Sequence, residues 1–283
     1  MPLNKGMTTS TIRERHLHTD VESLEEQLFL RMGNNQGVVT NHLSDDQEHE
    51  SRAEQFLHLT SELSEGGERV LREPNAGGNS LLSEVLSFEL MHVKYGATLE
   101  KTEMEINYHS DTKKVDYSMQ VGGRKYGVSV TRAFHFVDDN LFTPKDVFRI
   151  LEKKLEGLPI ASKNVVRKDR WDTQVLHVWV RSFNVARLIQ EVYPTFPEDL
   201  RRNTIVMLTT APTVHCVFDE LSGDIDEIFT ARGIPKPVYV RTYEDDVFCD
   251  EDFCGMDQVE MDLEELMNNE FAFDSEDDGM GAD

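Results

Sequence analysis

Hydrophobic and polar positions follow two different periods along the middle of the chain. In some segments the apolar residues recur every three or four positions, the spacing of helices that bury one face. These segments are 81–95, 144–155 and 183–192. Ser80 and Thr143 stand directly before the first two segments as N-caps, and Pro144 occupies the first helical position of the second.

Between these segments, apolar and polar residues alternate or form short apolar runs, which is the pattern of strands. The alternating segments are 98–108, 115–121 and 126–132, and the apolar runs are 173–180 and 204–209. Gly122 and Gly123 predict a tight hairpin between the second and third strands. Residues 214–218 are expected to add a short strand and 225–229 a helical turn. The pattern predicts an α/β domain with a mixed-sheet α-β-β-β-α-β core.

Both flanks differ from this core. Residues 1–78 mix polar runs with one or two marginal helices, one of them opened by the Thr19 capping box, and are expected to form a flexible arm. The Gly77-Gly78 pair marks the predicted boundary, so the domain is placed at 79–243, with an edge strand at 238–240. Residues 244–283 are expected to form a disordered, acidic interaction tail.

Charge separates the same three regions. The chain carries a formal net charge of −24. Residues 81–243 hold 22 acidic and 22 basic side chains, whereas residues 244–283 hold 17 acids and no Lys or Arg. The domain is therefore neutral, and the acidity of the whole chain does not exclude nucleic acid as its ligand.

Composition also limits the class of protein. No run of 18 apolar residues is present, which excludes a hydrophobic membrane-spanning segment, and the first twenty residues lack the apolar stretch of a secretory signal. Three cysteines do not suggest a disulfide framework. These features favour a cytoplasmic or nuclear protein without a membrane partner.

A small set of polar residues interrupts the predicted core. Glu89 lies in the apolar stripe of the first helix, and Glu84 lies on a neighbouring face. Asp116 begins the second strand, and Ser129 and Thr131 share one face of the third. An ionised carboxylate in an apolar stripe is costly unless it is paired or binds a metal, so these acids are either site residues or stripe-edge residues that reach water.

This constellation resembles the PD-(D/E)XK nuclease superfamily, the restriction-endonuclease-like fold, whose core order is also α-β-β-β-α-β. Val115-Asp116 stands where that family has Pro-Asp, and Ser129-Val130-Thr131 stands where it has (Asp/Glu)-x-Lys. Glu89, or alternatively Glu84, matches the glutamate of the first helix. The resemblance implies a catalytic site at these residues and a Mg²⁺ or Mn²⁺ ion held by Asp116 and Glu89.

The motif departs from the family at two positions that carry the chemistry. Nuclease catalysis requires a second carboxylate for the metal and a lysine for the attacking water, but Ser129 and Thr131 occupy these places. We therefore expect a non-catalytic binding or assembly module with no cofactor, or with a weakly bound divalent metal. The alternatives are a metal-dependent nuclease that uses a displaced lysine (Lys113, Lys114 or Lys125), and a regulator acting through its acidic tail.

Two further segments are candidate binding sites. A basic loop with an adjacent aromatic residue is expected to contact phosphate, and a solvated loop anchored by its tryptophan is the alternative. Its residues are Lys163, Arg167, Lys168, Arg170 and Trp171. The tail interleaves its acids with apolar residues such as Leu263 and Leu266, a pattern that suits protein partners with basic surfaces. No two histidines show metal-binding helical spacing, so no histidine site is predicted.

Overall fold

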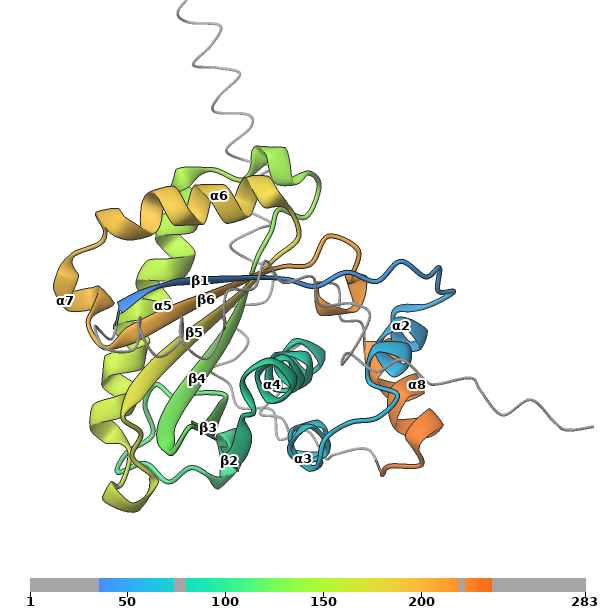
Figure 1. The fold of residues 1–283 in the computed structure, drawn as a ribbon, viewed down its shortest axis with the longest axis horizontal. Coiled ribbons are helices and arrows are strands. Elements are labelled where there is room, and N and C mark those ends of the chain that lie inside the picture. The colour runs from blue at the N-terminus through green and yellow to red at the C-terminus, as the bar shows by residue number, and fades with distance from the viewer. Residues whose placement is uncertain (1–35, 74–79, 219–221, 236–283) are drawn as a thin grey trace, which may run out of the picture. The chain divides into compact units, whose positions relative to one another are not determined.

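The computed structural model of the chain describes residues 36–73, 80–218 and 222–235 (Figure 1). The predicted helix near Thr19, the edge strand at 238–240 and the acidic tail at 244–283 lie outside the described residues.

A six-stranded mixed sheet forms the centre of this fold, with the strand order β1-β6-β5-β4-β3-β2. Its strands are β1 (Gln36–His42), β2 (Thr98–Thr102), β3 (Tyr117–Val121), β4 (Arg124–Ala133), β5 (Thr173–Val180) and β6 (Thr204–Thr210). Strand β3 runs antiparallel to both of its neighbours, and β4, β5, β6 and β1 run parallel to one another. The central strands β5 and β6 are buried along their whole length, as expected for parallel strands covered on both faces.

Seven α-helices in the described ranges cover the two faces of the sheet (Figure 1). They are α2 (Arg52–Leu59), α3 (Glu65–Arg72), α4 (Leu81–Tyr95), α5 (Pro144–Asn164), α6 (Phe183–Val192), α7 (Glu198–Arg201) and α8 (Ser222–Arg232). One core cluster joins α2, α3, α4 and α8 to the first face, and a second joins α5 and α6 to the other. The predicted mixed α/β class is confirmed.

Local sequence signals explain where the principal helices begin and end. The Thr143 hydroxyl accepts a hydrogen bond from the Asp146 amide, and the Asp146 carboxylate accepts one from the Thr143 amide, which forms a capping box at the start of α5. This helix continues to Asn164, past Pro159, and is therefore longer than predicted. Helix α4 ends at Gly96, whose φ of 63° is the left-handed conformation that glycine adopts without strain.

The described part of the predicted flexible arm belongs to the domain. Residues 36–73 contribute β1, α2 and α3, and β1 pairs in parallel with β6 over its whole length. Phe56 of α2 and Leu71 of α3 are completely buried in the first core cluster. The folded region therefore begins well before the expected boundary at Gly77-Gly78, because a parallel edge strand depends on a partner far away in the sequence.

Two strand predictions also require correction. The segment 98–108 is a strand only to Thr102, where a capping box between Thr102 and Glu105 turns the chain into a short 3₁₀ helix. Residues 214–218 hold a 3₁₀ turn at His215–Val217 in place of the expected strand. No helix among the described residues is long and apolar enough to cross a lipid bilayer.

Candidate functional site

The pairing of β3 with β4 ends at Asp116, the residue directly before β3, whose N–H still donates to the Val128 carbonyl over 2.9 Å. The paired register of these strands ends at Tyr117 opposite Val128. Beyond this point the Asp116 carboxylate accepts a hydrogen bond from the backbone N–H of Val130, which has no ladder partner on β3. Asp116 therefore occupies the fork between the two strands, where its carboxylate replaces a missing main-chain acceptor.

A lysine from the second helical layer reaches the same fork. Lys154 of α5 donates to the Ser129 hydroxyl over 3.2 Å and to the Val130 carbonyl over 3.0 Å. The N–H and C=O groups of one strand residue face the same neighbouring strand, so Asp116 and Lys154 both bind the edge of β4 that β3 leaves open. Ser129 itself is 5% exposed. We call Asp116, Ser129, Val130 and Lys154 the fork cluster.

The two candidate glutamates of α4 face different surroundings. Burial raises the pKa of the Tyr117 hydroxyl, its hydrogen bond with Ser87 opposes this, and the charges of Asp116 and Glu84 raise it further. Asp116 and Glu84 therefore both lie within electrostatic range of the Tyr117 hydroxyl.

Glu89 instead contacts helix α3. Its carboxylate accepts hydrogen bonds from the Ser64 amide over 3.0 Å and from the Ser64 hydroxyl over 2.6 Å. A Cβ added at Gly67 would lie 2.0 Å from Glu89 Oε1, so the backbone of α3 packs directly on this carboxylate. Burial lowers the pKa of Arg232 on α8, and the negative charges of Glu68 and Glu89 act against this shift. Among the two α4 carboxylates, Glu84, the alternative to Glu89, is thus the one whose charge acts on the Tyr117 hydroxyl together with that of Asp116.

The fork cluster is a poor match to the Mg²⁺ or Mn²⁺ ion that the nuclease resemblance implies. A hard divalent cation needs several oxygen ligands and anionic charge. The second carboxylate position holds the Ser129 hydroxyl, which is already bound by the Lys154 ammonium group. Thr131 is half-buried and pairs with Val178 of β5. Because an ammonium group occupies the place where the ion would need negative charge, we derive no metal-dependent step from these residues.

The lysines named as displaced candidates are engaged elsewhere. Lys114 forms an ion pair with Asp111 at 2.9 Å, and Lys125 forms one with Glu100. The side chain of Lys113 runs beside Gly157 of α5. The lysine at Ser129 is Lys154, which was not among the candidates.

The predicted basic loop begins in the last turn of α5, which holds Lys163, and continues beyond the helix, with exposed cations around one buried acid. Lys163, Arg167, Lys168 and Arg170 are exposed. Burial would raise the pKa of Asp169, but hydrogen bonds from Lys101 and Asn107 lower it to about 2. Trp171 is 8% exposed, and its indole ring covers Gly127 of β4. Its ring anchors the loop to the core and is not available to stack on a base.

A buried polar network crosses the interface between α4 and the sheet. The Ser87 hydroxyl bonds the Tyr117 hydroxyl and His177 Nδ1, each over 2.7 Å, and His177 Nε2 bonds the Thr209 hydroxyl over 2.8 Å. Burial lowers the pKa of His177 to about 3, so its ring is neutral at physiological pH. Ser87 and His177 are fully buried, which prevents the pair from acting as a nucleophile and base on a substrate.

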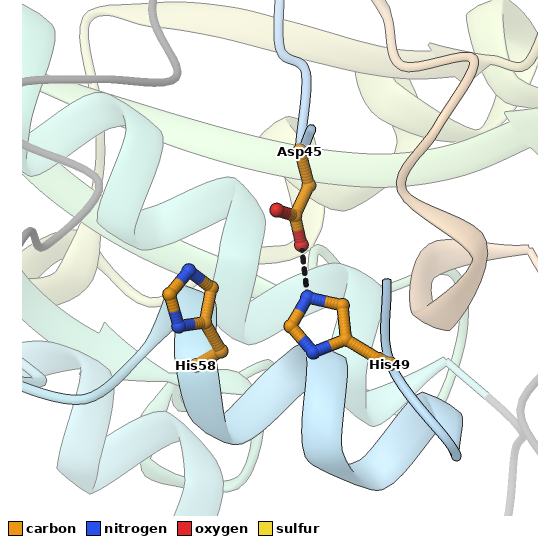
Figure 2. A group of neighbouring side chains, drawn as sticks. All are labelled: Asp45, His49 and His58. Carbon is orange, nitrogen blue, oxygen red and sulfur yellow. Dashed lines mark hydrogen bonds and ion pairs between the residues drawn. The ribbon is translucent and has the colours of Figure 1, made fainter. Parts of the chain in front are cut away.

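A second polar cluster, which sequence reasoning missed, lies after the carboxyl end of β1. Asp45, His49 and His58 each place one metal-binding atom within 4.8 Å of the other two (Figure 2). His49 Nε2 and Asp45 Oδ2 are 2.8 Å apart, and the centroids of the two imidazole rings are 5.1 Å apart. The available sequence signal was Asp45 four residues before His49, with His58 nine residues further on. This signal was missed because the two histidines do not have the spacing of metal ligands on one helix.

Part of the chain is similar to part of a longer protein. No family model and no solved structure matches it. The chain is similar to the AAC-rich mRNA clone AAC4 protein of Dictyostelium discoideum, with 42% identity over 162 residues. The match includes 55% of this chain but only 24% of that protein, so the chain corresponds to about a quarter of its relative's length.

Proposed function

We propose that the chain is a non-catalytic, nuclease-like binding or assembly module of a cytoplasmic or nuclear complex. The element order α4-β2-β3-β4-α5-β5 supports a relation to the PD-(D/E)XK superfamily, because it reproduces the α-β-β-β-α-β order of that core. The position of Asp116 at the strand fork supports the same relation.

The observation that carries the proposal is the contact between Lys154 and Ser129. In a metal-dependent nuclease, this position would supply a second negative charge to the cation. Here a neutral hydroxyl and an ammonium group occupy it, and the ammonium group repels a divalent ion. The fork cluster therefore joins α5 to β4, and the binding function belongs to the outer surfaces.

Two surfaces are the proposed contact regions. The exposed cations of the basic loop suit phosphate groups, so nucleic acid is one proposed ligand of residues 163–171. The 17 acids of residues 244–283 suit protein partners with basic surfaces, and a regulator acting through this tail is the related alternative.

A rearranged nuclease is the second candidate, and one specific observation favours it. Lys154 lies on α5, not on the strand that carries the family's lysine, but its ammonium group reaches that strand. The charges of Glu84 and Asp116 both raise the pKa of Tyr117. These three residues would have to provide the carboxylates and the cation of a displaced site.

A cleavage assay distinguishes the two candidates. The full chain is incubated with single- and double-stranded DNA and RNA in Mg²⁺ or Mn²⁺, beside Asp116→Asn and Lys154→Met. Lys145→Met is the matched control, because Lys145 lies on the same helix but is exposed. The proposed module gives no cleavage above the protein-free rate. Cleavage that disappears in Asp116→Asn and Lys154→Met, and persists in Lys145→Met, would establish the nuclease instead.

A further inference from the structure

Asp45 is a buried carboxylate in a setting of imidazole and amide groups. Its side chain is 0% exposed, and its ion-pair partner in the described structure is His49. The carboxylate also accepts hydrogen bonds from the Gln47 amide and from Gln55 Nε2, each over 3.2 Å. A buried carboxylate needs a nearby cation to offset its lost hydration, and an imidazole supplies one only when it is protonated.

We infer that Asp45, His49 and His58 form a binding site for a zinc-type divalent cation. The inference does not depend on the proposed function, because the cluster lies outside the fork and shares no residue with it. One carboxylate and two imidazoles are the ligand types that zinc takes in sites with three protein ligands and an open fourth position.

The geometry requires only small adjustments to hold such an ion. Zinc binds these ligands at about 2.0–2.2 Å in a tetrahedron, which places neighbouring ligand atoms about 3.3 Å apart. Asp45 and His49 are already separated by 2.8 Å, and no pair in the cluster exceeds 4.8 Å. Shifts of the two imidazole rings by about 1–1.5 Å would bring all three ligand atoms to bonding distance. Figure 2 shows both rings beside the Asp45 carboxylate.

A supporting set of hydrogen bonds holds the carboxylate in place. Gln55 Nε2 donates to Asp45 and to the Thr213 carbonyl, over 3.2 and 2.8 Å, and Gln55 Oε1 accepts from the Cys216 amide. The Asp45 amide donates to the Thr213 hydroxyl over 2.8 Å. Outer contacts of this kind orient metal ligands, and they connect the cluster to the segment that follows β6.

The position of the cluster is also typical of ligand sites. Strands β1 and β6 are parallel, Asp45 follows β1, and Thr213 follows β6. Ligands of open α/β sheets bind outside the carboxyl ends of the strands. The two imidazoles favour zinc over Mg²⁺ or Ca²⁺, which prefer oxygen ligands.

Metal titration of the full chain tests the inference. The chain is freed of metal with a chelator and titrated with ZnCl₂ by calorimetry and with Co²⁺ by visible absorption. We expect one ion per chain with a dissociation constant below about 1 μM and the intense absorption of tetrahedral Co²⁺. His49→Gln and His58→Gln should each weaken zinc binding at least 100-fold, whereas His215→Gln, at an exposed histidine, should leave it unchanged.

NMR spectroscopy of the wild-type chain tests the same site without relying on variants that could fail to fold. Zinc should shift the ring NMR signals of His49 and His58 at one equivalent and leave those of His215 in place. Affinity weaker than about 100 μM, unshifted His49 and His58 signals, or binding that survives both substitutions would overturn the inference.

Discussion

The buried histidine His177 makes stability depend on pH in a way that can be calculated. Its pKa is lowered to about 3 by burial, whereas an unfolded histidine titrates near 6.5. Between these values the unfolded chain binds a proton that the folded chain does not. The free energy of unfolding must therefore fall as the pH drops below about 6.5.

The magnitude follows from the linkage relation. Each pH unit in this window changes the free energy of unfolding by about 1.4 kcal/mol per proton. Between pH 7.5 and pH 5.5, the contribution of His177 therefore amounts to about 1.4 kcal/mol, because only the last unit lies below the unfolded pKa. This is a measurable part of the 5–15 kcal/mol that stabilises a typical domain.

Urea unfolding at the two pH values measures the effect, with His177→Gln as the comparison. The glutamine removes the titrating group but keeps polar atoms for Ser87 and Thr209. We expect the variant to be less stable at pH 7.5 and to lose about 1.4 kcal/mol less than the wild type on acidification. His215→Gln, at an exposed residue, should keep the wild-type pH dependence. Equal losses in the wild type and His177→Gln would refute the assignment of a neutral, buried His177.

Two further predictions concern the loop after α5. Gly127→Ala should lower the free energy of unfolding by about 1–3 kcal/mol, because the new Cβ would lie 2.5 Å from the Trp171 ring. Gly157→Ala is the control, because its new Cβ would lie 3.6 Å from the nearest atom of the Lys113 side chain. Asp169→Asn should lower the free energy of unfolding by about 1.5–3 kcal/mol at pH 7. This loss should disappear as the pH falls from about 4 towards 2, because the contacts that lower the pKa of Asp169 stabilise only its ionised form. The control Asp111→Asn, at an exposed residue, should change the free energy of unfolding by less than about 0.5 kcal/mol. Urea unfolding checks both, and a destabilised control or an unaffected loop variant would contradict the packing described.

Local patterns predicted the elements whose signals lie within a few residues. The β3–β4 hairpin follows from alternation around Gly122-Gly123, and the start of α5 follows from Thr143 and Pro144. Strand β1 was missed because its partner β6 lies more than 150 residues away, and nothing near β1 indicates that pairing. Similarly, no spacing rule connects Lys154 to Ser129, since the contact depends on how α5 packs on the sheet.

The histidine cluster shows a related limit of sequence patterns. Asp45 and His49 precede α2, and His58 lies in its last turn, so no single helix face contains all three. Their proximity depends on the loop between β1 and α2 folding back on that helix. Spacing rules for metal ligands describe a few motifs with fixed intervals, and ligands that a loop brings together can match none of them.

The two glutamates of α4 show why position in a helix stripe does not decide function. This helix is buried on almost every side from Leu81 to Met91, because it lies between the sheet and α3. A carboxylate on any face of α4 therefore needs a partner, and both Glu84 and Glu89 stand out in the sequence as acids in an apolar helix. Glu89 receives its hydrogen bonds from Ser64 at the start of α3, where the partial positive charge of the helix favours an anion. That role is structural. Glu84 is the α4 carboxylate whose charge, like that of Asp116, raises the pKa of Tyr117, so it remains the α4 candidate for chemistry at the fork.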